Sequence, residues 1–211
     1  VQMTFSTNDS PFSGKEGKFV TSTKINDRLF REIQKDVSLK VERIGAGEEW
    51  IVSGRGELHL GILIENMRRE GYEFQVARPK AIIKEINGEK CEPYEYAQVD
   101  TPNETIGSVI ELLGSRGGVL ENMESGYTQS RLIYTIPSRG LIGLSTDFMT
   151  ASKGYGTLSH YFLEYRKIEA INMGNRKLGV LVASQTGMST AYGIGQIEDR
   201  GIMFIEPNEE V

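Results

Sequence analysis

The sequence holds few residues suited to metal or redox chemistry. Its 211 residues include one cysteine, Cys91, and two histidines, His59 and His160. A single cysteine cannot form an internal disulfide, which fits a reducing compartment. Zinc sites and cysteine–histidine nucleophile pairs need more ligands or partners than this set supplies. We therefore expect a cytoplasmic chain without a metal site.

Long apolar runs and a basic surplus are also missing. No apolar stretch approaches the roughly 18 residues of a membrane span, and the first residues given do not form a signal-peptide pattern. The formal net charge is −5, from 24 basic and 29 acidic residues. Nucleic-acid binders usually carry a basic surplus, because phosphate contacts drive their affinity. We expect no membrane or DNA partner, and any RNA contact must come from a local patch.

The sequence lacks a nucleotide-binding loop. A Walker A loop needs Gly-x-x-x-x-Gly-Lys-[Ser/Thr]. The pairs Gly14-Lys15 and Gly17-Lys18 are followed by Glu16 and Phe19, with Asp9 and Phe12 where the first glycine should stand. Gly193-Ile194-Gly195 lacks the third glycine and the helix that a dinucleotide site requires. We expect neither a cofactor nor catalysis in this chain.

The first 78 residues alternate between strand-like and helix-like patterns. Residues 1–5, 37–41, 50–52 and 72–76 read as strands. Ile25, Leu29 and Ile33 predict one helix, and Leu60, Leu63, Ile64 and Met67 predict another at i, i+3, i+4 and i+7. This order is strand, helix, strand, strand, helix, strand.

Residues 79–168 repeat that order. A strand is predicted at 81–83, followed by a turn at Asn87-Gly88. Further strands are predicted at 119–120, 132–136 and 158–165. Thr101-Pro102-Asn103-Glu104 looks like a capping box with proline at the first helical position. A helix follows, in which Ile106, Val109, Ile110 and Leu113 at i, i+3, i+4 and i+7 are expected to face the core. A weaker helix, interrupted by glycines, holds Leu141, Leu144 and Phe148.

These patterns predict an α+β protein with two successive ferredoxin-like βαββαβ sandwiches, residues 1–78 and 79–168. Residues 169–211 look like a small β-rich region, because apolar runs at 178–183 and 202–205 flank glycine-rich chain. The chain begins in strand-like alternation without an initiator methionine, so we expect a piece of a longer protein.

One segment is especially informative, Ser53-Gly54-Arg55-Gly56-Glu57-Leu58-His59-Leu60. It reads structurally as a strand-to-helix turn, and we expect Gly54 or Gly56 to adopt a positive φ. Glu57 and His59 point about 200° apart on a helix, so they are poorly placed as an acid–base pair. Gly-x-Gly-Glu-Leu-His-Leu at such a junction resembles the third domain of translational GTPases such as elongation factor G. That family has an acidic residue where Gly61 stands here.

A second segment, Pro137-Ser138-Arg139-Gly140-Leu141-Ile142-Gly143, resembles the fifth domain of the same factors. The stretch 153–161 after it is similar to the BipA/TypA family, in which the third-domain and fifth-domain units follow one another directly. The region from 169 is similar to the start of the C-terminal domain of that family. The resemblance covers essentially the whole chain.

The resemblance implies a ribosome-associated translational GTPase, with GTP and magnesium bound by a domain that this chain lacks. It implies docking near the ribosomal A site, with rRNA and the tRNA acceptor region as partners. It also implies roles in large-subunit assembly and in stress or cold adaptation. On this basis the chain is a ribosome-binding module and not itself an enzyme.

Arginines at predicted element ends are the candidate ribosome contacts, since loop arginines can pair with phosphate bidentately. They are Arg55, Arg116 and Arg139, with Arg176 and Lys177 as weaker candidates. Each can equally be a solvated surface charge. The alternative function is a regulatory module that binds a small molecule between paired ferredoxin-like domains. The net negative charge of the chain fits that alternative slightly better.

Overall fold

A computed structural model describes residues 1–11, 13–45, 47–170, 183, 185–200, 203 and 205–211. The chain divides into two compact units, Val1–Met173 and Gly174–Val211. The first unit contains two antiparallel sheets, each with its own helices and its own hydrophobic core. The predicted pair of βαββαβ sandwiches is therefore confirmed.

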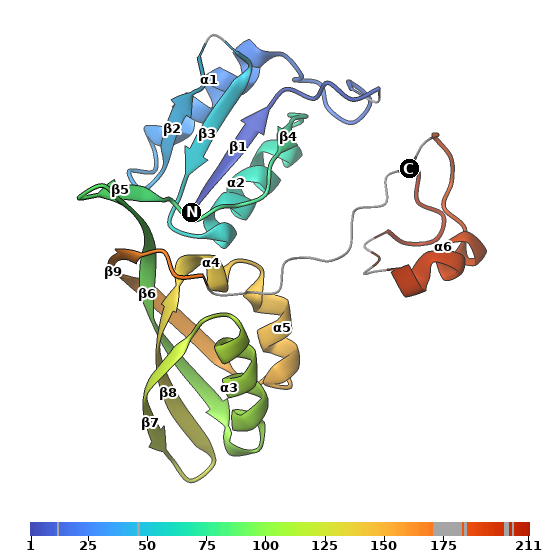
Figure 1. Ribbon diagram of the computed structural model, residues 1–211. Helices are drawn as coiled ribbons and strands as arrows, with labels where there is room; N and C mark the ends of the chain where they lie inside the picture. The colour runs from blue at the N-terminus through green and yellow to red at the C-terminus, as the bar shows by residue number, and fades with distance from the viewer. Residues whose placement is uncertain (12, 46, 171–182, 184, 201–202, 204) are drawn as a thin grey trace. The chain divides into compact units, whose positions relative to one another are not determined.

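The first sandwich has the expected element order. Its sheet runs β2-β3-β1-β4 with antiparallel neighbours, and α1 and α2 pack on one face (Figure 1). The elements are β1 (Gln2–Ser6), α1 (Ser22–Ile33), β2 (Lys40–Arg43), β3 (Glu49–Ser53), α2 (Glu57–Arg69) and β4 (Gln75–Val76).

The core of the first sandwich follows the predicted helix stripes. Leu60, Leu63 and Met67 are buried on α2, and they meet the fully buried Trp50 and Phe5 from the sheet. Inward residues alternate along β3, as expected for a sheet that faces helices on one side only. Apolar periodicity thus identified the core-facing side of these elements.

Two strands of the first sandwich are shorter than predicted. The strand expected from Val37 begins at Lys40, because Asp36 accepts hydrogen bonds from the backbone N–H and the hydroxyl of Ser38 and holds a turn there. The strand expected from Tyr72 is reduced to Gln75–Val76. Tyr72 instead forms an isolated bridge with Phe19.

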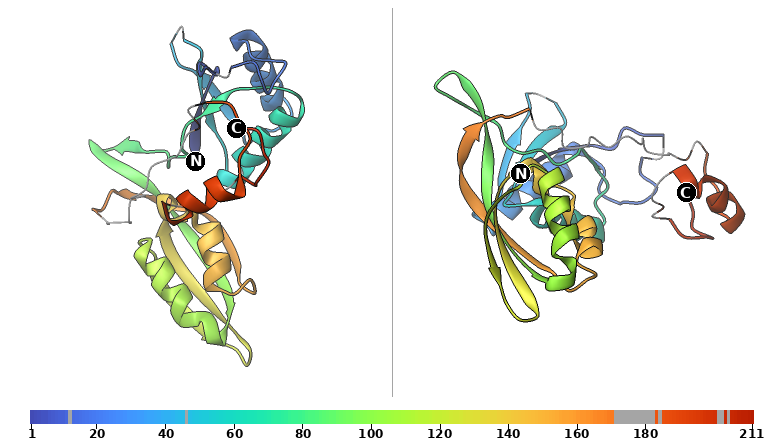
Figure 2. Two further views of the ribbon diagram at one scale, coloured as in Figure 1. Left: turned by 90° about the vertical axis from the view of Figure 1, so that its right-hand side faces the viewer. Right: turned by 60° about the horizontal axis from the view of Figure 1, so that its bottom comes forward.

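The second sandwich repeats the order with one extra strand. Its sheet runs β7-β8-β6-β9, and the short β5 forms a hairpin with the start of β6 (Figures 1 and 2). The elements are β5 (Lys84–Ile86), β6 (Glu89–Pro102), α3 (Ile106–Ser115), β7 (Val119–Ser125), β8 (Gln129–Pro137), α4 (Ser138–Leu141), α5 (Leu144–Ala151) and β9 (Thr157–Lys167).

The predicted capping box is wrong. Pro102 is the last residue of β6 and pairs with Gln129, so the strand runs through the expected helix start. The Thr101 hydroxyl pairs with that of Thr105, at 2.8 Å, and caps no helix amide. A 3-10 turn, η1 (Asn103–Thr105), precedes α3. The turn at Asn87-Gly88 has φ of 54° and 79° and closes the β5–β6 hairpin as predicted.

The second unit, predicted from the sequence as β-rich, is only partly described. Its described residues form a helix, α6 (Ala191–Ile197), the 3-10 turn η2 (Glu198–Arg200), and a bridge between Met188 and Glu210. The apolar runs at 178–183 and 202–205 lie mostly outside the described residues. Gly193 and Gly195 lie inside α6, which the sequence did not predict. The Thr190 hydroxyl caps it by accepting from the Gly193 N–H.

Candidate functional site

The turn from β3 into α2 is tight without a left-handed residue. Gly56 has φ −165° and ψ 176°, which is extended backbone, and Gly54 also lacks a positive φ. The expected positive φ is therefore wrong. Gly54 is required for space, because a Cβ there would lie 2.8 Å from His59 Nδ1 and 2.9 Å from Leu60 Cδ2. A Cβ on Gly56 would meet nothing within 4 Å.

His59 connects this turn to Asp36, which lies just after the end of α1. Its Nε2 lies 2.6 Å from Asp36 Oδ2, and its Nδ1 accepts from the Arg55 backbone N–H at 3.3 Å. Hydrogen bonds from Ser38, together with His59, lower the pKa of the Asp36 carboxyl to about 2. Asp36 is thus ionised near neutral pH and holds the imidazole in place. The role of His59 here is positional.

Two positions in the second motif, residues 137–143, require glycine. Gly143 has φ 68° and separates α4 from α5. A Cβ on Gly140 would lie 2.2 Å from the Arg116 carbonyl oxygen, so only glycine allows α4 to approach the end of α3 so closely. The Gly143 N–H donates to Glu57 Oε2 at 2.8 Å. The two motifs therefore meet directly.

A buried carboxylate lies beside this contact. Glu95 on β6 accepts from the Ser138 hydroxyl at 2.5 Å and lies 2.5 Å from His160 Nδ1 on β9. Burial alone raises the pKa of the Glu95 carboxyl, but the hydrogen bonds from His160 and Ser138 outweigh it and lower the pKa. The same contact with Glu95 raises the pKa of His160. No sequence pattern indicated this trio, whose members are far apart along the chain.

Both motifs line one cleft of about 390 Å³ within the first unit. Apolar side chains such as Leu58, Leu141 and Phe148 share its wall with Arg55 and His160. Its acidic groups already have partners, since Glu95 is bound by Ser138 and His160, and Glu57 by Gly143. The arrangement suits a fixed joint better than acid–base chemistry on a ligand.

The three described candidate arginines differ in their partners. Arg55 is exposed, and its side chain has no hydrogen-bond or ion-pair partner among the described residues. Arg116 donates to the Ile142 carbonyl at 3.0 Å and to Asp147 at 2.6 Å, so it ties α3 to α5. Arg176 and Lys177 lie outside the described residues.

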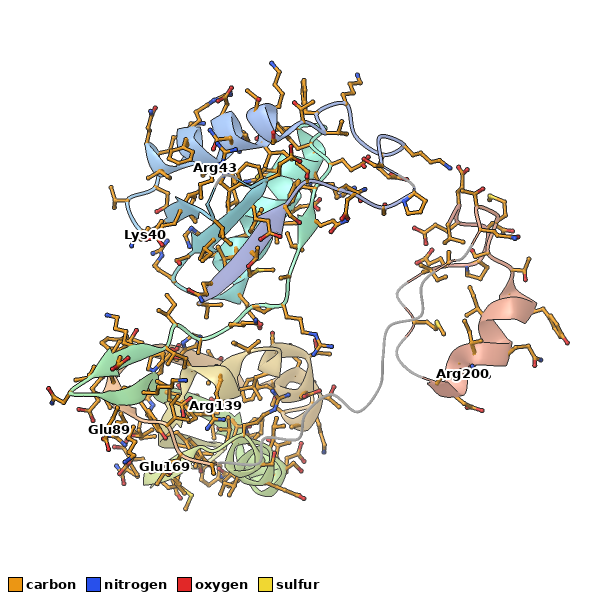
Figure 3. The ribbon with its side chains drawn as sticks, turned by 45° about the horizontal axis from the view of Figure 1, so that its top comes forward. Lys40, Arg43, Glu89, Arg139, Glu169 and Arg200 are labelled. Atoms are coloured by element: carbon orange, nitrogen blue, oxygen red, sulfur yellow. The ribbon has the colours of Figure 1, made fainter. Side chains whose placement is uncertain are left out.

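Arg139 faces a fully buried acid. Its Nε lies 2.7 Å from Glu92 Oε2, an ion-pair distance, although the angles do not make this contact a hydrogen bond. Its Nη2 donates to the Glu169 carbonyl at 2.7 Å; Figure 3 labels Arg139 and Glu169. Arg139 therefore balances a buried charge, which sequence spacing could not reveal.

Metal-binding clusters and membrane-spanning helices are not found in the described part of the chain. No group of three or more metal-binding side chains gathers there. None of its helices is long and apolar enough to cross a bilayer.

Three family models match the chain in consecutive order. Elongation factor G domain III matches residues 18–78, the elongation factor G C-terminus matches 89–174, and the TypA/BipA C-terminal domain matches 178–211. A crystal structure of a Thermus thermophilus protein shares the fold, with a TM-score of 0.54 at 14% identity. That match covers 81% of this chain and 41% of the other.

Curated relatives match the whole chain. Proteins named "Large ribosomal subunit assembly factor BipA" are 55% identical in Bacillus subtilis, 50% in Synechocystis and 48% in Haemophilus influenzae. Each match covers 100% of this chain, which spans only about a third of the relatives' length (34–35%). From the ordered domain models and this identity, the chain belongs to the TypA/BipA family.

Proposed function

We propose that this chain is a ribosome-binding part of a large-subunit assembly factor whose GTPase chemistry resides elsewhere in the protein. One observation carries the proposal: the elongation factor G and BipA models match in series, and relatives named as large-subunit assembly factors align over the full chain. GTP and magnesium belong to the whole protein, which we place in the cytoplasm on ribosomal RNA and the tRNA acceptor region.

The physical character of the first unit supports a binding role. Each sandwich has its own hydrophobic core, and the motifs that mark the family connect the sandwiches through Glu57 and Gly143. Rigid elements suit a module that positions another domain, because contacts on rigid supports lose little order on binding. We propose three modules, 1–78, 79–168 and 169–211, that act together in stress and cold adaptation.

Arg55 is the first-choice ribosome contact among the arginines predicted from sequence. It is exposed beside the cleft and has no intrachain side-chain partner in the described residues. Arg116 and Arg139 remain proposed contacts through their exposed parts, but each also has a structural task. For Arg176 and Lys177 the proposal rests on the sequence alone.

The metabolite-sensing alternative has less support. It needs several polar groups in the cleft that await a ligand, but the cleft acids Glu57 and Glu95 are already hydrogen-bonded within the chain. Among the charged side chains of the cleft wall, Arg55 alone has no partner in the described residues. The name of the relatives, large ribosomal subunit assembly factor, also points to the ribosome.

Co-sedimentation tests the proposal. The chain is spun through a sucrose cushion with purified large ribosomal subunits at low salt, and a tube without ribosomes serves as control. We expect the chain in the ribosome pellet, with binding that saturates. A chain that stays in the supernatant at every subunit concentration contradicts the proposal.

A further inference from the structure

Helix α1 and the turn that ends it carry three cations along one line. Lys24, Arg31 and Lys35, hereafter the α1 stripe, are all exposed. At 100° per residue, Arg31 and Lys35 lie within about 20° of the direction of Lys24. At a rise of about 1.5 Å per residue, the stripe spans roughly 16 Å along the helix and its C-terminal turn. The buried residues Ile25 and Leu29 point elsewhere, into the core.

These cations have no direct partner within the chain as far as it is described. None of the three makes a side-chain hydrogen bond or ion pair there. Arg31 and Lys35 act on Glu70 only through space, and their effect in lowering its pKa is smaller than that of Arg28. Arg28 is buried and bound by Glu70, at 2.6 and 2.7 Å, and by Glu32. Glu70 and Glu32 are thus already bound by Arg28, and the exposed Asp27 is the other acid of α1 beside the stripe.

In the second sandwich, unlike on the α1 stripe, almost all lysines and arginines have a partner within the chain. Between residues 84 and 167, every lysine and arginine but one is engaged within the chain. The exception is Lys90, which is exposed. Unpaired positive charge in the first unit therefore concentrates on the first sandwich, although the whole chain is acidic.

The location of two stripe residues adds to the case. Lys24 lies in the first turn of α1, where the helix dipole disfavours a cation and no acidic residue offsets it. Lys35 precedes Asp36, which binds His59, and His59 in turn accepts from the Arg55 backbone. The end of the stripe is thus connected to Arg55 through Asp36 and His59. Together the stripe and Arg55 give one sandwich four cations without a direct partner among the described residues.

We propose that the α1 stripe binds the phosphate backbone of double-helical RNA, an inference that rests on the proposed function and names the partner's chemistry. Spaced, unpaired cations on a rigid helix suit a ladder of phosphates. An acidic protein partner would call for an apolar centre as well. The one large exposed apolar side chain of α1, Phe30 at 43% exposure, projects about 120° away from Lys24.

The test measures how salt affects binding of the chain to a defined RNA duplex and to purified large subunits. The variants are Lys24→Glu, Arg31→Glu and Lys35→Glu, singly and combined, and Lys90→Glu is the matched control. We expect the combined variant to bind duplex RNA at least about tenfold more weakly. Its log–log salt slope should be shallower by roughly 0.9 per lost phosphate contact. Lys90→Glu should match the parent chain.

Folding of the variants is checked by Trp50 fluorescence, because Trp50 is the single tryptophan and lies in this core. Lys24→Glu improves the helix dipole, so a loss of affinity in that variant cannot reflect a weaker helix. The inference is overturned if the folded combined variant and the parent chain bind RNA equally well. It is also overturned if the parent chain fails to bind duplex RNA. Weakened subunit binding with unchanged RNA binding also overturns it, because the stripe would then contact protein. Failure of the parent chain to sediment with subunits, by contrast, counts against the proposed function.

Discussion

Arg139 shows how one residue can carry a structural task inside a family motif. It is the cation that faces the fully buried Glu92, and it also holds the backbone at Glu169. A buried carboxylate without its cation is costly, because its charge loses both water and counter-charge. A change at Arg139 therefore acts on folding before it acts on any partner.

We predict that Arg139→Ala destabilises the second sandwich. The cost should be below the about 3–5 kcal/mol of a fully buried pair, because 31% of the Arg139 side chain is exposed. Urea unfolding followed by circular dichroism measures it. Adding Glu92→Gln should restore part of the loss. Arg131→Ala is the control, since it breaks a more exposed ion pair with Asp100 and should cost much less. Equal stability of Arg139→Ala and the parent chain would contradict this account.

At this scale the sequence predicted residue types better than their partners. It singled out Gly140, Gly143, Glu57 and His59. Glu57 and Gly143 join the two motifs, His59 binds Asp36, and Gly140 lets α4 approach the end of α3. It could not show that Arg116 and Arg139 are engaged or that Glu95 bridges Ser138 and His160. Those contacts join residues 26 to 65 positions apart, which local spacing does not encode.

Among the elements, α2 has two clearly different faces. Leu63 is 4% exposed and faces the sheet, whereas its neighbour Ile62 is 51% exposed. We predict that Leu63→Ala costs roughly 2–5 kcal/mol. Ile62→Ala should stay within about 0.5 kcal/mol. Urea unfolding monitored by Trp50 fluorescence reports both. Equal effects of the two substitutions would place the core on the wrong face of α2.

A loop in the first sandwich depends on one carboxylate. Glu73 is 8% exposed and accepts from the Asn8 side chain and from the backbone N–H groups of Gly14, Glu16 and Gly17. Burial raises the pKa of the Glu73 carboxyl, but these donors outweigh it and the net pKa is lowered from its ordinary 4.5. The stabilisation is therefore present above pH 4.5 and is lost as pH falls through the lower, folded-state pKa.

We accordingly predict that acid releases the contacts of Asn8, Gly14, Glu16 and Gly17 with Glu73. Hydrogen exchange of the Gly14 and Gly17 amides, corrected for intrinsic pH effects, should show protection at about pH 6 that disappears in stronger acid. Glu73→Gln should remove most of this protection at the higher pH, because the amide has one acceptor oxygen and its NH₂ faces donors. Unchanged protection in Glu73→Gln would show that the loop is held by other contacts.

Element order was predictable, and element ends were less so. Apolar periodicity identified α1, α2 and α3, but β6 extends through Pro102 because Thr101 and Pro102 pair with β8. Ile110, predicted as core, is only partly buried, while its neighbour Val109 is fully buried. Tertiary pairing decides such boundaries, and a local pattern does not contain it.

For the whole molecule, the division of labour can be checked with nucleotide. The sequence has no Walker A loop, and the cleft acids of the first unit already have partners. We predict that titration calorimetry of this chain with GTP and magnesium shows no heat of binding. A micromolar dissociation constant would mean that nucleotide binds to residues other than a P-loop.

The central claim is that these domains bind the large ribosomal subunit. Electron cryo-microscopy of purified large subunits with saturating chain tests it most directly. The account predicts density that fits both sandwiches, with one of them against ribosomal RNA. Subunits without added density at saturation, in a sample whose chain is folded by Trp50 fluorescence, would contradict it.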